Sequence, residues 1–210
     1  IAKDKSKRLS EKEDAKKETF LPPHLSVIER TGSSYNFSDT YYYGVSNITG
    51  APSSWAKSYM DSADALSITM LADGSYQSAI TRKTLARLAA NTARTLGLVE
   101  DVSDPIAVVQ QLGVMQPNAD GSFDTTSQVT RQMAATVLLR LLRQSSVVFE
   151  ADMTMLSRYP DSGAISDWAR EAVAMMTQYD LMNGTTKGFE PKKDMTLEQC
   201  LVLLTRICEF

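Results

Sequence analysis

The sequence predicts an all-α fold with long loops, and two features of its hydrophobic pattern carry that prediction. Apolar side chains recur at intervals of three and four residues along several segments after residue 54, as expected for one buried helix face. No segment shows sustained alternation of apolar and polar residues with β-branched enrichment, the pattern typical of half-buried strands. With 210 residues, 43% of them hydrophobic, the chain is long enough for one domain or two small ones.

The chain divides into a polar N-terminal stretch and a series of amphipathic helices. Residues 1–34 are predicted to be a charged lead-in or linker, because they are mostly polar and offer no continuous apolar face to bury. The following stretch, up to residue 54, contains prolines, glycines and a tyrosine cluster and predicts no regular element. The helical stripes after it are Trp55-Tyr59-Ala63-Leu66, Leu85-Leu88-Ala89-Thr92-Leu96, Ala134-Val137-Leu138-Leu141, Trp168-Ala172-Met175-Met176-Tyr179 and Cys200-Leu201-Leu204-Ile207-Cys208.

One local pattern occurs three times, an apolar residue followed by Thr at the start of a helix. The copies are Ile80-Thr81-Arg82, Val129-Thr130-Arg131 and Met195-Thr196-Leu197, spaced 49 and 66 residues apart. Each copy follows a glycine turn that carries an aromatic residue, at 73–76, 120–123 and 184–189. The sequence therefore contains three copies of a unit made of a helix, a glycine turn and a Thr-started helix.

The three threonines Thr81, Thr130 and Thr196 are predicted N-caps. A Thr hydroxyl at this position accepts a hydrogen bond from a backbone N–H of the first turn, which stabilises the helix by about 1 kcal/mol. In the third copy Gln199 also stands at the capping-box position, where its side chain reaches back to the backbone of the cap residue.

Capping does not explain the Arg that follows the Thr in two copies. A cation beside a helix N-terminus is mildly unfavourable, so Arg82 and Arg131 are candidates for meeting an anion there. Free backbone N–H groups and a guanidinium together suit a carboxylate or a phosphate. The alternative for both residues is a solvated arginine or an internal ion pair.

The ordered set of motifs resembles the S-layer homology repeat. The third copy carries it through Tyr159-Pro160-Asp161, Trp168-Ala169, Leu181-Met182-Asn183-Gly184, Phe189-Glu190-Pro191 and Met195-Thr196. The first copy carries it through Phe37-Ser38-Asp39, Trp55-Ala56, residues 73–76 and Ile80-Thr81-Arg82. The second keeps Leu112-Gly113-Val114, residues 120–123 and Val129-Thr130-Arg131 but lacks the Trp. On this resemblance the repeats span 35–98, 99–145 (degenerate) and 146–210, and form one module.

The resemblance implies three helix-loop-helix repeats in a pseudo-threefold arrangement around a central three-helix bundle. It also implies a secreted, bacterial protein associated with the cell wall or S-layer. The expected function is non-covalent anchoring, through binding an anionic secondary cell-wall polysaccharide with a pyruvylated sugar as one candidate ligand. A direct role in membrane insertion is not expected.

The resemblance places the ligand carboxylate at Arg82 and Arg131. Trp55, Trp168, Gly184 and Lys187 would line or support the grooves between repeats. Because both tryptophans lie on apolar stripes, packing in a core or groove wall is the main contribution expected of them. Three lysines lie around the third turn, Lys187, Lys192 and Lys193. Their side chains could supply cations near a groove, and they could equally be solvated loop charges with no ligand.

Departures from the family pattern leave a second function open. Leu197 replaces the Arg in the third copy, and none of the copies keeps the Glu of the family's helix start. One or two competent grooves, or a divergent ligand, are therefore expected. The alternative is a module that has lost glycan binding and docks a surface protein or assembles a lattice.

Composition argues against several other classes of function. The single histidine, His24, excludes a site with two imidazoles, and no nucleophile pattern or phosphate loop is present, so an enzyme is not expected. Eight residues apart on one helix, Cys200 and Cys208 would lie about 12 Å from each other, beyond the reach of a disulfide. A calcium loop around Gly121 would need carboxylates at Gln116 and Ser127, so no metal and no cofactor are expected.

Charge and hydropathy narrow the partners further. Residues 1–34 carry eight Lys and Arg against six Asp and Glu, and residues 35–210 carry 14 against 19, giving +2 and −5. An acidic body argues against a nucleic acid as the main partner. No apolar run approaches the roughly 20 residues that span a bilayer. The sequence begins at Ile1 and leaves open whether a signal peptide or anchor precedes it.

Overall fold

The structure, a computed structural model, describes residues 46–144 and 150–210. The predicted lead-in at 1–34 and the Phe37-Ser38-Asp39 start of the first repeat lie outside these residues. Along the described chain the elements are β1 (Asn47–Thr49), α2 (Lys57–Ala65), β2 (Asp73–Ser75), α3 (Arg82–Thr95), α4 (Pro105–Gln111), α5 (Arg131–Leu142), the 3-10 helices η1 (Met153–Arg158) and η2 (Ser162–Ala164), α6 (Asp167–Gln178) and α7 (Leu197–Glu209). The described fold is therefore largely helical, as the hydrophobic periodicity predicts.

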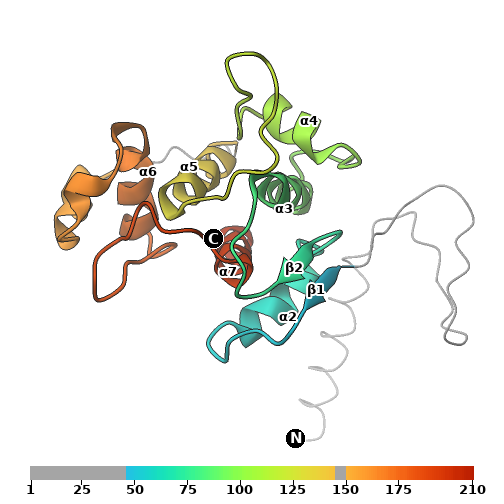
Figure 1. The fold of residues 1–210 in the computed structure, drawn as a ribbon, viewed down its shortest axis with the longest axis horizontal. Coiled ribbons are helices and arrows are strands. Elements are labelled where there is room, and N and C mark those ends of the chain that lie inside the picture. The colour runs from blue at the N-terminus through green and yellow to red at the C-terminus, as the bar shows by residue number, and fades with distance from the viewer. Residues whose placement is uncertain (1–45, 145–149) are drawn as a thin grey trace, which may run out of the picture. The chain divides into compact units, whose positions relative to one another are not determined.

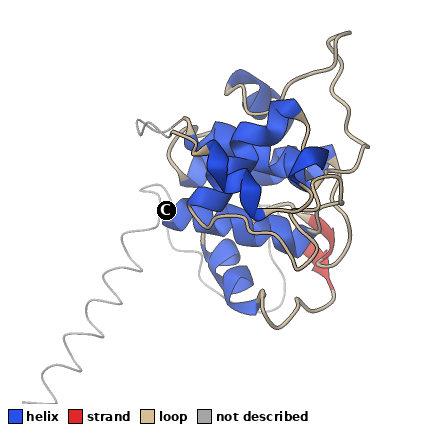
Figure 2. Cartoon of the chain, turned by 90° about the vertical axis from the view of Figure 1, so that its left-hand side faces the viewer, coloured by secondary structure: helices blue, strands red, loops and turns tan. Residues whose placement is uncertain are grey.

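One short sheet departs from the all-α prediction. Strands β1 and β2 pair in parallel, with Asn47 opposite Asp73 and Thr49 opposite Ser75. Helix α2 lies between them in the chain and supplies the crossover that a parallel pair requires. Strands of three residues are too short to show an alternating pattern, which is why the sequence does not predict them. In Figure 2 this strand pair lies at one side of an otherwise helical fold.

Helices α3, α5 and α7 pack against one another at the centre of the described fold (Figure 1). Their packing surfaces are apolar or small side chains, such as Leu88 and Ala89 in α3, Leu138 in α5 and Leu201 and Leu204 in α7, all at most 1% exposed. The close approach of three helices around alanines and leucines forms the centre of the core. The outer helices α4, α6 and α2 pack on α3, α5 and α7 respectively.

The segments entering the three central helices are joined by a closed ring of backbone hydrogen bonds. The N–H of Ile80 donates to the carbonyl oxygen of Met195 at 2.9 Å, and the N–H of Met195 donates to that of Val129 at 2.7 Å. The N–H of Val129 donates back to the carbonyl oxygen of Ile80 at 3.0 Å. These are the three apolar residues that precede the repeated threonines, and each is at most 4% exposed. The division into three repeats at 35–98, 99–145 and 146–210 remains a prediction.

Candidate functional site

The threonines that precede the central helices do not all cap in the same way. Thr81 accepts a hydrogen bond from the N–H of Thr84 at 3.3 Å. Thr196 accepts one from the N–H of Gln199 at 3.4 Å, and Gln199 completes the capping box. Thr130 forms no side-chain cap, and its hydroxyl is buried without a hydrogen-bond partner. Thr130 therefore stands at the N-cap position of α5, as predicted, but without the expected side-chain hydrogen bond, and other groups accept from the backbone N–H groups at this helix start.

Those other groups are carbonyl oxygens from neighbouring turns, and they occupy all three helix starts. The N–H groups of Arg131 and Gln132 donate to the carbonyls of residues 193 and 191 at 2.9 and 3.1 Å. The N–H groups of Arg82 and Lys83 donate to the carbonyls of residues 127 and 125, and those of residues 197 and 198 donate to the carbonyls of residues 78 and 76. The expectation that free N–H groups of the first turn help to hold an anion is therefore wrong. Each start is closed by the turn that precedes another central helix.

The two arginines predicted to hold a ligand carboxylate also contact these turns. In Arg82 the Nε donates to the carbonyl of Asp124 at 3.1 Å and an Nη donates to that of Gln116 at 3.0 Å. Its guanidinium lies 4.8 Å from the ring centroid of Phe123. The structure therefore places Arg82 against the aromatic turn at 120–123, with two of its five N–H donors in use.

Arg131 makes the corresponding set of contacts with the third turn. Its Nε donates to the carbonyl of Phe189 and an Nη donates to that of Asn183, both at 2.8 Å. The guanidinium lies 5.1 Å from the Phe189 ring centroid. Arg131 is only 7% exposed, and this burial lowers its pKa, while the negative charge of Glu190 raises it. These contacts stabilise the turn, and a direct ligand role for both arginines remains a prediction.

The two tryptophans are placed differently from the sequence-based expectation. Trp55 is 53% exposed and Trp168 is 57% exposed, so neither is packed in the core. Their neighbours Ala56 and Ala169 are fully buried instead, whereas Ala63, Ala172 and Met175, farther along the predicted stripes, are buried as expected. Exposed indole faces at the starts of α2 and α6 are available for stacking against an apolar or sugar face.

Gly184 and Lys187 lie in the third turn and have different roles. A Cβ at Gly184 would approach the carbonyl oxygen of Gly188 and the ring of Tyr159 to 2.6 Å each, so only glycine fits there. Lys187 is exposed at the tip of the turn. The third turn forms one wall of an open hollow of about 390 Å³. The residues that line this hollow are Arg158, Tyr159, Pro160, Asp180, Asn183, Gly184, Thr185, Thr186 and Gly188.

The second residue of each central helix faces the start of an outer helix. At the α5–α6 junction Gln132 accepts from the N–H of Ser166 at 3.0 Å and donates to its hydroxyl at 3.2 Å. The Nζ of Lys192 also donates to the Ser166 hydroxyl, at 2.7 Å. Trp168 follows two residues later with its ring exposed. This junction therefore combines an ammonium group, polar side chains and an exposed aromatic residue.

The α2–α7 junction has the same layout and the opposite charge. Glu198 accepts from the N–H of Ser53 at 2.9 Å and from its hydroxyl at 2.8 Å. The side-chain amide of Gln77 donates to the same carboxylate at 3.2 Å. Glu198 is 5% exposed and forms no ion pair with any residue that the structure describes. Trp55 again follows the serine by two residues, but here the side chain that binds the serine is a buried carboxylate, whose negative charge disfavours an anionic ligand.

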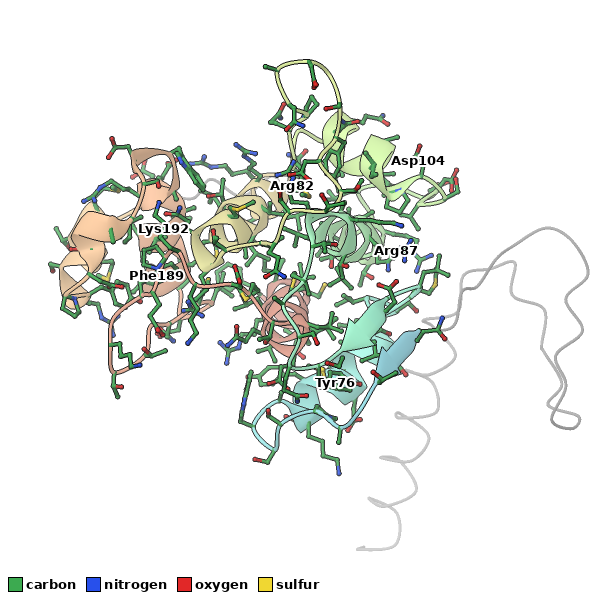
Figure 3. The ribbon with its side chains drawn as sticks, viewed as in Figure 1. Tyr76, Arg82, Arg87, Asp104, Phe189 and Lys192 are labelled. Carbon is green, nitrogen blue, oxygen red and sulfur yellow. The ribbon has the colours of Figure 1, made fainter. Side chains whose placement is uncertain are left out.

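The α3–α4 junction is cationic. Lys83 occupies the position of Gln132 and Glu198, and it lines a hollow of about 240 Å³ together with Arg87, Ser103 and Asp104. Figure 3 shows Arg87 on α3 and Asp104 at the start of α4 on the same side of the described fold. The second residue of each central helix thus lies beside the start of an outer helix, and the three residues, Gln132, Glu198 and Lys83, differ in charge.

The cysteines and acidic clusters carry no sign of a metal centre. Burial raises the pKa of the Cys200 thiol to about 12 and that of Cys208 to about 11, so both stay protonated at neutral pH. Across the ranges that the structure describes, no group of three His, Cys, Asp or Glu side chains is arranged to hold a metal ion. In the same ranges, no helix is both long and apolar enough to cross a membrane.

Comparisons with known proteins give one family match, in the C-terminal part of the chain, and one relative. Residues 158–199 match the S-layer homology domain, which is generally a non-catalytic module that anchors proteins to the cell wall. A segment of 106 residues, 49% of this chain, is 26% identical to an endoglucanase of Bacillus sp. (strain KSM-635). That segment spans only 11% of the endoglucanase. The matched domain contains Trp168, Gly184, Lys187 and Lys192, and it implies association with the cell surface or S-layer.

Proposed function

We propose that this protein attaches non-covalently to the bacterial cell wall by binding an anionic polysaccharide. The match of residues 158–199 to the S-layer homology domain is the observation that carries the proposal. We further propose that the chain contains three such repeats, at 35–98, 99–145 and 146–210. The ring of backbone bonds between Ile80, Val129 and Met195 supports this, because equivalent residues of each proposed repeat meet there.

The α5–α6 junction, whose Ser166, Trp168 and Lys192 lie in the matched domain, suits a sugar that carries a carboxylate. The Lys192 ammonium is exposed and fixed by the Ser166 hydroxyl, which directs a positive charge to the surface beside α6. The exposed Trp168 ring offers a face on which a pyranose ring stacks. A pyruvylated sugar is one ligand with this chemistry. Arg82 and Arg131 contribute mainly by holding the turns in place, since their guanidinium groups are bound to carbonyl oxygens.

The proposal further implies a secreted, wall-associated protein whose wall-binding role requires no cofactor, metal or enzymatic activity of its own. The similarity to the endoglucanase fits a wall-attached accessory segment, because the shared region is a small fraction of that enzyme. The competing function is a protein–protein or lattice-forming module. The carboxylate of Glu198 at the α2–α7 junction favours a partner other than an anionic glycan at that one place.

Co-sedimentation with purified cell wall tests the proposal at the level of one side chain. Lys192→Ala removes the ammonium beside Ser166, whereas Lys193→Ala removes the adjacent lysine, which pairs with Glu190 at 3.4 Å instead. The two variants have the same net charge. We expect Lys192→Ala and Trp168→Ala to reduce the sedimented fraction several-fold and Lys193→Ala to leave it near the wild-type value. Equal sedimentation of all variants would contradict the assignment of the α5–α6 junction, and binding unchanged by removal of the wall polymer would favour a protein partner.

A further inference from the structure

We propose that the hollow at the α3–α4 junction is a second binding site for a sugar carboxylate, with Lys83 and Arg87 as its cations. This inference rests on the proposed function and extends it to a part of the chain that the S-layer homology match at 158–199 does not cover. The site is formed by different residues from those of the α5–α6 junction.

The two cations lie one helical turn apart on α3 and line the same hollow. Residues four apart are neighbours on one face of a helix, and like charges at this spacing destabilise the helix slightly. The hollow of about 240 Å³ is closed on the other side by Ser103, Asp104, Pro105 and Ile106. Among the described residues neither Lys83 nor Arg87 forms an ion pair. An anion in the hollow would therefore relieve the repulsion between two cations that form no ion pair of their own.

Arg87 is held in place and still has an unused donor. One Nη donates to the carbonyl oxygen of Leu71, which fixes the end of the side chain. The Nε is buried and has no hydrogen-bond partner. A buried N–H without an acceptor costs free energy, and because the Nε is enclosed, the Nη groups are the donors within reach of a ligand in the hollow. Gln132 and Thr136 stand at the corresponding positions of α5, where no such pair of cations exists.

Asp104 narrows the class of ligand. Its Oδ1 accepts from the N–H of Ala107 at 3.0 Å and caps α4, so the carboxylate stays at the edge of the hollow. A negative charge there disfavours a compact, doubly charged anion such as phosphate. The same carboxylate accepts hydrogen bonds from hydroxyl groups. Cations on one wall and a hydroxyl acceptor on the other fit a single carboxylate carried on a hydroxylated ring.

The site is tested with the intact chain, using glucuronate and inorganic phosphate as probes in an NMR titration of the backbone amides. We expect glucuronate to shift the amide signals of residues 103–107, and phosphate to shift them less. Lys83→Gln/Arg87→Gln should abolish these shifts. Lys57→Gln/Arg143→Gln, a double variant of equal charge at two exposed positions, should retain them. Because Arg87 also contacts Leu71, Lys83→Gln alone, at an exposed position, serves as the variant that cannot fail through misfolding.

Binding of the purified acidic wall polymer separates this inference from the proposed function. With two sites on one chain, loss of the α3–α4 site should weaken polymer binding by about tenfold or more, through lost avidity. The second site alone would be overturned if wild type and Lys83→Gln/Arg87→Gln bound the polymer with equal affinity. It would also be overturned if glucuronate shifted only the amide signals of Ser166 and Lys192. Stronger shifts with phosphate would overturn the carboxylate assignment. Absence of any polymer binding by the wild type would overturn the proposed function itself.

Discussion

The backbone N–H of Val129 donates to the carbonyl oxygen of Ile80 at 3.0 Å, although the two residues are 49 positions apart in the sequence. Met195 joins the same pair through two more bonds and closes the ring. Each central helix therefore starts at a point whose backbone is held by the starts of the other two. We expect the described unit to unfold cooperatively, because disrupting one start removes partners from both others.

The first prediction concerns the packing beneath this ring. Met195 is fully buried, so Met195→Ala removes core contacts and leaves a cavity, at a cost of about 2–5 kcal/mol in the free energy of unfolding. Met153→Ala is the matched control, because Met153 is 46% exposed and its truncation should change the free energy by less than about 0.5 kcal/mol. Urea denaturation followed by circular dichroism measures both. Similar losses for the two variants would show that the ring is not at the centre of the stable core.

The second prediction separates the structural role of Arg131 from that of a surface arginine. Arg131→Leu introduces the residue that α7 already carries at its corresponding position, Leu197, but it leaves the carbonyls of Phe189 and Asn183 without their donors. We expect a loss of about 2–3 kcal/mol in the free energy of unfolding. Arg143→Leu, which breaks an exposed ion pair with Glu171, should cost about 0–1 kcal/mol. Equal losses in thermal or urea unfolding would contradict the assignment of Arg131 as a buried support.

The repeated threonines and Arg131 show how much of the structure the sequence alone predicts. The Thr-started helices were predictable because capping depends on residues within one turn of the chain, as at Thr81 and Thr196. The partners of Arg131 lie 52 and 58 residues away, so local spacing indicates an unexplained cation but not the carbonyls that hold it. The aromatic residue repeated in each glycine turn was the available signal, since Phe123 and Phe189 stack on the two guanidinium groups.

The candidate site was predicted less completely than the fold. Gln132 and Glu198 lie on predicted helices, yet nothing local indicates that each faces a serine from a distant helix start. Trp55 and Trp168 were expected to pack in a core or a groove wall because they extend apolar stripes, and their exposure excludes the core. The alanine that follows each tryptophan is buried instead, and the first turn of a helix leaves room for this one-residue shift.

The third prediction compares the two polar junctions directly. Glu198→Gln should retain the contact with Ser53, because Gln132 binds the equivalent Ser166 by accepting from its N–H and donating to its hydroxyl. We expect a melting temperature within a few degrees of the wild type, because one oxygen binds both the N–H of Ser53 and the amide of Gln77, so that only the Ser53 hydroxyl must rotate, from donating to accepting. Glu198→Ala should cost about 1–3 kcal/mol by leaving the donors of Ser53 and Gln77 unpaired. A larger loss for Gln than for Ala would contradict this account of the α2–α7 junction.

The fourth prediction concerns acid stability and the loop that closes the start of α3. Hydrogen bonds from Ser127 and Thr126 lower the pKa of Asp124 from 3.8 to about 2. A carboxyl whose pKa is lower in the folded than in the unfolded protein adds stability above its unfolded value. That contribution is lost as the pH falls from about 4 to about 2. Asp124→Asn should flatten the pH dependence of the unfolding free energy in this window only. An unchanged profile would show that these hydrogen bonds are absent in solution.

The claim that the protein holds the wall through a carboxylate is tested most directly by calorimetric titration of the purified wall polymer. The polymer is titrated as isolated and after its carboxyl groups have been converted to neutral amides with a carbodiimide and an amine. The account predicts saturable binding to the native polymer, weakened by rising salt, and loss of that binding after amidation. Equal affinity for the native and the amidated polymer would contradict the account.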